Sequence, residues 1–246
     1  MGKNQDCYVA FLDIMGFADF VMGEPGIKVL SYLRQFMDFA DTLNVKGLDL
    51  DVRIFSDCVI ISTPAGGGFA EYHKFLLYVC NLQFAALTAG GLGLLPVRGS
   101  ITKGQFYTDN AGLTFGHALV SAHGLENQIA VYPRVIISLE DYTPEKARES
   151  NLAVNALNWG MKVSHAEKAS TVRRDFDGLL HLNYLSAVYA TPDKWIPQGN
   201  QYVAAHKDFI AENIKKFQGN KRVSAKYEWM KNYHNWFCEG FKDLLI

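Results

Sequence analysis

Residues 7–17 of this chain read CYVAFLDIMGF, and this stretch decides the fold. Residues 7–12 are all apolar, the first charge is Asp13, and a glycine follows at position 16. A short apolar run without alternation of polar residues is typical of a strand buried on both faces. We therefore place residues 7–14 at the centre of a β-sheet. With 246 residues, the chain can form one large domain or a domain with a substantial appendage.

The composition is that of a globular protein with balanced charge. Apolar residues make up 49% and charged residues 20%, which excludes general disorder. Lys plus Arg is 24 and Asp plus Glu is 25, so the chain has no broad cationic field for nucleic acid or acidic membrane. The uncharged segment 75–97 contains polar residues and glycines that divide it into a helix, a turn at 90–93 and a strand. Residues 1–6 lack the apolar segment of a signal peptide, so we expect a soluble cytoplasmic protein without nucleic-acid or membrane partners.

Periodicity outward from the first strand predicts an α+β order. Helices are expected where apolar residues recur every three or four positions, and Ser56-Asp57 between two β-rich runs is typical of a tight hairpin turn. In chain order the predicted elements are strand 7–14, helix 26–43, hairpin 52–62, helix 69–89, strand pair 95–107, helix 116–129 and strands 135–138 and 178–185. This order predicts an α+β sandwich with helices on one face of a mainly antiparallel sheet.

The C-terminal part has helical spacing from residue 201 to residue 241, with a stripe of aromatic residues near its end. No Pro-rich or Ser-rich linker precedes it. We expect residues 1–200 to form the main domain and residues 201–246 to form a helical extension packed on that domain.

Two acidic residues stand where strands end. Asp13 follows the buried strand, and Asp57 lies at the tip of a hairpin that can pair beside it. Two carboxylates at one sheet edge can hold two divalent cations for an in-line attack on a phosphate. Alternatively, Asp13 caps the next helix and Asp57 forms a turn, and spacing alone favours these structural roles. Gly16 favours the first interpretation, because it lets backbone N–H groups approach a triphosphate.

Four segments together resemble the class III nucleotide cyclases. Residues 11–17, FLDIMGF, are similar to the F-x-D-I-x-G-F signature of that family, and residues 97–101, VRGSI, to its R-x-G strand. Arg53 sits four positions before the second acid, where the family carries a residue that reads the base. Residues 116–126, GHALVSAHGLE, resemble the helix G-x-x-V-N-x-A-x-R-L-E, with Val120 and Gly124 in place of its Asn and Arg. The resemblance covers residues 7–138 and implies a ferredoxin-like sandwich whose catalytic domain is residues 1–200.

Within this family, the combination is most similar to the bacterial pyrimidine cyclases of the Pycsar antiphage system. Residues 175–178, DFDG, before NYL at 183–185 contribute to this resemblance. It implies a homodimer with shared active sites that converts UTP to 3′,5′-cyclic UMP and pyrophosphate as a defence signal. Conversion of CTP to cyclic CMP is the nearest alternative.

The resemblance also implies a role for each matched residue. Asp13 and Asp57 would bind two Mn²⁺ or Mg²⁺ ions, with the Ile14 carbonyl as a further ligand. Gly16 and Phe17 would cradle the β- and γ-phosphates, and Arg98 would clamp them. The catalytic residues would be Asp13, Asp57 and Arg98, the metal-binding residues Asp13, Ile14 and Asp57, and the substrate-binding residues Ile14, Gly16, Phe17, Arg53 and Arg98.

The base-reading positions depart from those of purine cyclases. Arg53 can only donate hydrogen bonds, and Leu113 stands where those enzymes carry a polar residue. Arg53 could donate to O2 or O4 of a pyrimidine, whereas the polar side chains that usually recognise adenine are absent at these positions. Arg134 and Lys103 are candidates to replace the arginine missing at Gly124. Two alternatives remain open: a silent nucleotide-binding regulator, favoured by the changes at Val120 and Gly124, and a purine or diguanylate cyclase, disfavoured by the absence of a GGDEF hairpin.

Overall fold

The computed structural model describes residues 3–43, 47–88, 95–109, 111–138, 142, 166–190 and 201–246. The strands are β1 (Lys3–Ile14), β2 (Asp51–Phe55), β3 (Cys58–Pro64), β4 (Val97–Thr108), β5 (Thr114–Phe115), β6 (Val135–Ile137), β7 (Val172–Arg174) and β8 (Leu180–Leu182). The α-helices are α1 (Phe17–Gly23), α2 (Gly26–Thr42), α3 (Gly68–Thr88), α4 (His117–Gln128), α7 (Ala166–Ala169), α8 (Gln201–Lys216) and α9 (Lys221–Phe237). Two 3₁₀ helices, η2 (Tyr184–Ala190) and η4 (Lys242–Leu244), complete the described elements. The glycine turn expected at 90–93 lies outside the described residues.

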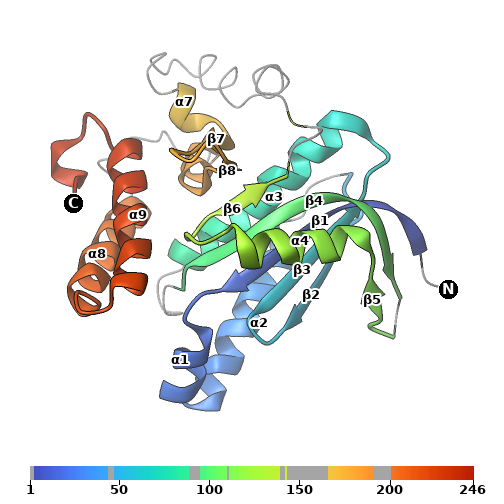
Figure 1. Ribbon diagram of the computed structural model, residues 1–246, viewed down its shortest axis with the longest axis horizontal. Coiled ribbons are helices and arrows are strands. Elements are labelled where there is room, and N and C mark those ends of the chain that lie inside the picture. The colour runs from blue at the N-terminus through green and yellow to red at the C-terminus, as the bar shows by residue number, and fades with distance from the viewer. Residues whose placement is uncertain are drawn as a thin grey trace.

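The strands form one sheet in the order β2-β3-β1-β4-β6-β8-β7, with β5 pairing β4 (Figure 1). Every pairing is antiparallel except that of β4 with β6. Strand β1 pairs with β3 on one side and with β4 on the other. The predictions of an α+β fold, a mainly antiparallel sheet and an inner first strand are therefore confirmed.

Strand β1 is buried on both of its faces, because helices cover the sheet from two sides. Tyr8 and Leu12 point into the larger core, which also contains Phe75 of α3. Val9, on the alternate face, packs with Ala118 of α4. Figure 1 shows α4 in front of the sheet and α3 behind it. The prediction that helices lie on one face is therefore wrong, and the uninterrupted apolar run of β1 is the physical reason.

Two predicted elements differ from the observed ones. Residues 95–107 were expected to be a strand pair but form the single strand β4, which pairs with β1 from Val97↔Ile14 to Thr108↔Lys3. Gly99 permits this pairing, since a Cβ there would lie 2.4 Å from the carbonyl oxygen of Phe11. The strand expected at 178–185 is shorter, because β8 ends at Leu182 and η2 begins at Tyr184.

The helical spacing predicted from residue 201 to residue 241 corresponds to two helices, α8 and α9. Helix α9 begins after Asn220, whose side chain accepts a hydrogen bond from the N–H of Val223 at 3.2 Å. The helix buries Trp229 and Tyr233 in the same core as the sheet, and the Tyr233 hydroxyl donates to Asn183 Oδ1 at 2.5 Å. Among the helices that the structure describes, none has the length and apolar character needed to cross a membrane.

Candidate functional site

Asp13 and Asp57 lie side by side, because strand pairing places the β2–β3 turn next to the end of β1. In the β1–β3 ladder Asp13 is opposite Cys58, the residue that follows Asp57. The Ile14 N–H donates to the carbonyl oxygen of Asp57 at 2.8 Å, which ties the turn to the strand end. Both acids line one cavity of about 420 Å³, which we call the acid cavity. This volume is within the usual range for a small-molecule site.

The thiol of Cys58 lies beside the acid pair, with Sγ 3.7 Å from Asp57 Oδ1. Burial raises the pKa of Cys58 to about 11, and the negative charges of Asp57 and Asp13 contribute to the increase. Both carboxylates therefore act on the same thiol, as expected if they face the same small space.

Arg98 joins the acids to helix α4. It stands opposite Asp13 in the β1–β4 ladder, and its Nε lies 2.7 Å from Asp13 Oδ2. Its Nη2 lies 2.8 Å from Glu126 Oε1 of α4. Burial raises the pKa of Glu126, and the charge of Arg98 opposes this increase. Glu126 is a site residue that the sequence pattern did not assign a role, although it ends the helical motif at 116–126.

The turn after β1 forms another wall of the acid cavity. Gly16 has a φ of 78°, a left-handed conformation that side chains rarely adopt. The N–H of Met15 donates to the Pro96 carbonyl at 2.8 Å, which holds this turn against the start of β4. Ile14, Gly16 and Phe17 line the acid cavity with Asp13, Asp57 and Arg98, so six of the seven predicted site residues are brought together.

The oxygen donors of the cavity suit a hard divalent cation. Two carboxylates and the Ile14 carbonyl are ligands that Mg²⁺ and Mn²⁺ prefer. Within the described part of the chain, no group of three or more His, Cys, Asp or Glu side chains could hold a metal alone. The residues therefore fit an ion that takes its remaining ligands from bound phosphates, which is how Mg²⁺ usually binds.

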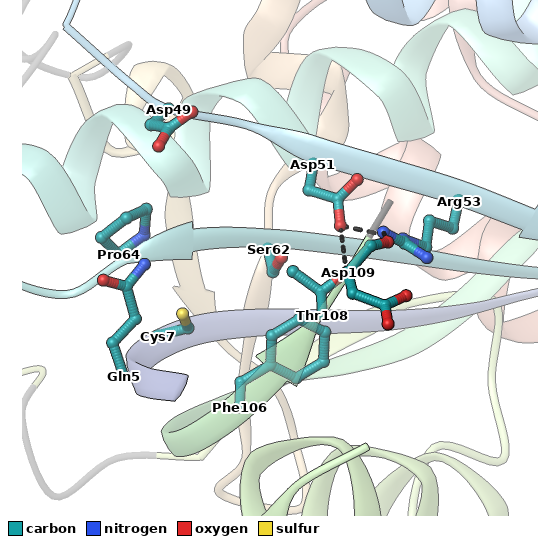
Figure 2. Close-up of a pocket in the computed structure, with 10 residues that line it drawn as sticks. All are labelled: Gln5, Cys7, Asp49, Asp51, Arg53, Ser62, Pro64, Phe106, Thr108 and Asp109. Atoms are coloured by element: carbon teal, nitrogen blue, oxygen red, sulfur yellow. Dashed lines mark hydrogen bonds and ion pairs between the residues drawn. The ribbon is translucent and has the colours of Figure 1, made fainter. Parts of the chain in front are cut away.

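Arg53, the seventh predicted residue, is not part of the acid cavity. It lines a separate cavity of about 180 Å³ with Asp51, Thr108 and Asp109, which we call the Arg53 cavity (Figure 2). Arg53 donates from Nε to Asp51 Oδ2 at 2.9 Å and from Nη2 to the Asp109 carbonyl at 2.8 Å. Thr108 Oγ1 also donates to Asp51 Oδ2, at 2.9 Å. Asp51 was missed in the sequence, although residues two apart on a strand share a face.

The residues proposed to compensate for Gly124 have other roles. Arg134 is 1% exposed and forms ion pairs with Asp175 and Asp177. Asp175 also accepts a hydrogen bond from Trp229 Nε1 of α9, at 2.8 Å. The ammonium of Lys103 lies 5.9 Å from the ring centre of Tyr8. Neither Arg134 nor Lys103 lines the acid cavity.

Helix α9 supplies wall residues that no sequence pattern indicated. Arg222 and Lys226 line the acid cavity, although they are more than 160 positions from Asp57 in the chain. Their spacing of four places them on one face of the helix. No pattern in the sequence predicts which surface this face of α9 packs against.

No protein family model and no curated protein matches the chain. Several solved adenylyl and guanylyl cyclases resemble it in structure. For the monomeric guanylyl cyclase domain of the RhoGC fusion protein from the aquatic fungus Blastocladiella emersonii, the TM-score is 0.50 and the identity 14%, over 73% of this chain and 95% of that one. For the adenylyl cyclase CyaB from P. aeruginosa, the TM-score is 0.45 and the identity 18%, over 62% of this chain and 85% of that one. For a bacterial light-regulated adenylyl cyclase they are 0.44 and 15%, over 56% of this chain and 44% of that one, so the chain spans less than half of that protein. The fungal match shows that the chain has a class III cyclase-like fold.

Proposed function

We propose that this protein is a nucleotide cyclase that converts UTP to 3′,5′-cyclic UMP and pyrophosphate. The observation that carries the proposal is the acid cavity, in which Asp13, Asp57, Arg98 and the Gly16 turn meet within a cyclase fold. CTP is the alternative substrate. The resemblance of the motifs to Pycsar cyclases supports a role for the product as a signal in antiphage defence.

In this proposal the carboxylates of Asp13 and Asp57, with the Ile14 carbonyl, hold two Mg²⁺ or Mn²⁺ ions. These ions, when bound, supply positive charge that lowers the pKa of the 3′-hydroxyl and stabilises the pentavalent transition state. The backbone N–H groups of Gly16 and Phe17 orient the phosphates. The 3′-oxygen bonds to the α-phosphorus, the bond from that phosphorus to the bridging oxygen breaks, and the hydroxyl proton passes to solvent. Arg98 orients the Asp13 carboxylate through its 2.7 Å contact with Oδ2.

The proposed active site is shared between two copies of the chain. Within one chain, Arg53 and the acid pair line separate cavities, and in this proposal one nucleotide contacts the acid pair of one protomer and Arg53 of the other. Phe55 on the strand of Arg53 is 82% exposed, and Leu113 and Phe115 are 63% and 61% exposed. Large exposed apolar side chains of this kind commonly mark interaction surfaces. Their position near Arg53 supports a homodimer in which this surface meets the partner.

The Arg53 cavity supports recognition of a pyrimidine. It combines the donor groups of Arg53 with the acceptor carboxylate of Asp51, which Arg53 and Thr108 hold in place. A uracil ring presents the acceptors O2 and O4 and the donor N3–H, which such a pair can satisfy.

The test is to incubate the purified protein separately with ATP, GTP, CTP and UTP plus Mn²⁺ or Mg²⁺, and to identify products by mass spectrometry. Cyclic UMP as the main product is the expected result. A purine cyclic nucleotide as the main product would refute the base assignment. Tight nucleotide binding without any product would instead support a silent regulator, the alternative that Val120 and Gly124 favour.

A further inference from the structure

The wall of the acid cavity that faces helix α9 is cationic. Arg222 and Lys226 of α9 line this cavity together with Asp13, Asp57 and Arg98. Arg98 is already engaged by two carboxylates, Asp13 and Glu126. Within the described part of the chain, neither Arg222 nor Lys226 forms an ion pair. The cavity therefore holds two cationic groups whose charges are available to a ligand.

The electrostatic environment of Lys226 shows that these groups act on one another. Burial lowers the pKa of Lys226, the charges of Arg98 and Arg222 lower it further, and the charge of Asp13 raises it. Lys226 is thus half-buried near two cations and one acid. An anion that enters the cavity would relieve the repulsion among Lys226, Arg98 and Arg222.

Contacts at the start of α9 and beyond Lys226 hold this helix in place. Its start is capped by Asn220, and Tyr227 stacks on Phe217 with ring centres 5.7 Å apart and an interplanar angle of 1°. Further along the helix, the buried Trp229 donates to Asp175, which also holds Arg134. Pro133, the residue before Arg134, also lines the acid cavity. The helix that carries Arg222 and Lys226 is therefore anchored to the sheet beside the cavity.

We propose that Arg222 and Lys226 bind the terminal phosphates of the triphosphate, from the same chain that supplies Asp13 and Asp57. This inference rests on the proposed function for the nature of the substrate. Breaking the bond to the α-phosphorus increases the negative charge on the departing pyrophosphate, and two fixed cations at that end stabilise this charge. They would take the role of the arginine that the cyclase family carries at the position of Gly124, but from helix α9 instead of α4.

The test measures binding of inorganic tripolyphosphate and of UMP, both with Mg²⁺, by isothermal titration calorimetry. For a variant with Arg222→Gln and Lys226→Gln, tripolyphosphate affinity should fall roughly tenfold or more, the effect of losing charge-assisted hydrogen bonds. UMP affinity should change by less than about twofold, because UMP has no terminal phosphates. The conservative variant Lys226→Arg should retain most of the affinity.

Lys221→Ala is the matched control. Lys221 is an exposed cation in the same helical turn as Arg222 but does not line the acid cavity. Its loss should leave tripolyphosphate binding unchanged, and circular dichroism should show equal helix content in all variants. Equal losses from Lys221→Ala and from the double variant would overturn the inference, as would a wild-type protein that does not bind tripolyphosphate.

Failure of the inference can be told apart from failure of the proposed function. If the wild-type protein makes a cyclic nucleotide and the double variant binds tripolyphosphate equally well, the role of Arg222 and Lys226 is wrong and the cyclase proposal stands. If binding depends on both residues but no nucleotide is cyclised, the cyclase proposal is wrong and the phosphate site stands.

Discussion

Asp13 and Asp57 carry the chemistry in the proposed function, and strand register sets the position of both. Asp13 is opposite Arg98 in one ladder and opposite Cys58 in the other. The Arg98 guanidinium therefore reaches Asp13 and the buried Glu126 at once. Loss of either metal-binding acid should affect the reaction directly, whereas loss of Arg98 also leaves Glu126 without its cation.

Asp13→Ala or Asp57→Ala should reduce turnover on the order of a thousandfold or more, because each variant removes ligands of the proposed ions. Turnover is measured as cyclic product formed per enzyme per minute. Asp41→Ala, at an exposed position on α2, is the control and should keep wild-type activity. Near-wild-type turnover by either site variant would show that the two-metal assignment is wrong.

Arg53→Ala should change the choice of base. If Arg53 donates to a pyrimidine acceptor, kcat/KM for UTP should fall by a factor equivalent to about 1 to 3 kcal/mol of transition-state stabilisation. The preference for UTP over the other triphosphates should narrow. Parallel assays with all four nucleotides measure this. An equal loss with every nucleotide would assign Arg53 to folding or to phosphate binding.

At the scale of elements, Arg134 links β6 to the turn before β8 and, through Asp175, to α9. Arg134 is 1% exposed, and Asp175 is buried beside it. Arg134→Ala would leave buried negative charge unpaired and should lower the free energy of unfolding by about 3 to 5 kcal/mol. Urea unfolding measures this change.

The control for Arg134 is Arg174→Ala. Arg174 donates to the Gly178 carbonyl at 2.7 Å but is exposed, so its loss should cost less than about 1 kcal/mol. If the two variants were equally stable, the buried ion pairs of Arg134 would not be what holds the turn and α9 in place.

A chain of buried hydrogen bonds connects η2, α8, α9 and the C-terminal residues. Tyr184 Oη lies 3.0 Å from His206 Nε2, His206 Nδ1 lies 3.0 Å from His234 Nδ1, and His234 Nε2 lies 2.9 Å from the Leu244 carbonyl. A carbonyl only accepts, so His234 donates from Nε2 and accepts from His206, which accepts from Tyr184. Both imidazoles are neutral in this arrangement.

Acid should therefore weaken the packing of α8 and α9. Burial lowers the pKa of His206, and the neighbouring His234 lowers it further. Burial lowers the pKa of His234 to about 4, with Lys207 contributing in the same direction. Because the folded pKa is depressed, the stabilisation is complete above pH ~6.5 and is lost as the pH falls towards 4. Between pH 7 and 5, His234 alone should cost about 2 kcal/mol.

His234→Gln keeps a donor for the Leu244 carbonyl and removes the titrating ring. We expect this variant to be less stable than wild type at pH 7 but to lose less stability on acidification. Urea unfolding at pH 7, 6 and 5 measures, for each protein, the slope of the free energy of unfolding against pH. Parallel slopes for the two proteins would mean that His234 does not titrate in this range.

At the scale of the whole molecule, the two separate cavities lead us to a prediction about how two copies of the chain assemble. Arg53 and Asp57 are four positions apart in sequence but line different cavities. In a homodimer with shared sites, Asp57 of one protomer and Arg53 of the other would contact the same nucleotide.

Mixed dimers of Asp57→Ala and Arg53→Ala proteins should recover activity. One site of each mixed dimer carries both lesions, and the other combines the intact acids of one chain with the intact arginine of its partner. Activity should reach up to about half of the wild-type value per mixed dimer if the sites act independently. Co-expression with two affinity tags isolates the mixed dimer. A monomer by sedimentation, or pure mixed dimers no more active than their parents, would contradict the shared site.

The sequence by itself determined that residues 7–14 form a buried strand and that residues 52–62 form a hairpin with Asp57 at its tip, since both follow from local patterns. An apolar run specifies a buried strand, and a two-residue turn between β-rich runs specifies a hairpin, whereas the pairing of β1 with β3 that brings Asp13 to Asp57 was decided by the tertiary structure. Only the tertiary structure decided that α4 covers the second face, that Glu126 pairs with Arg98 and that α9 brings Arg222 and Lys226 to the acids. These contacts join segments far apart in the chain, and the apolar stripe of a helix specifies that it packs but not which surface it meets.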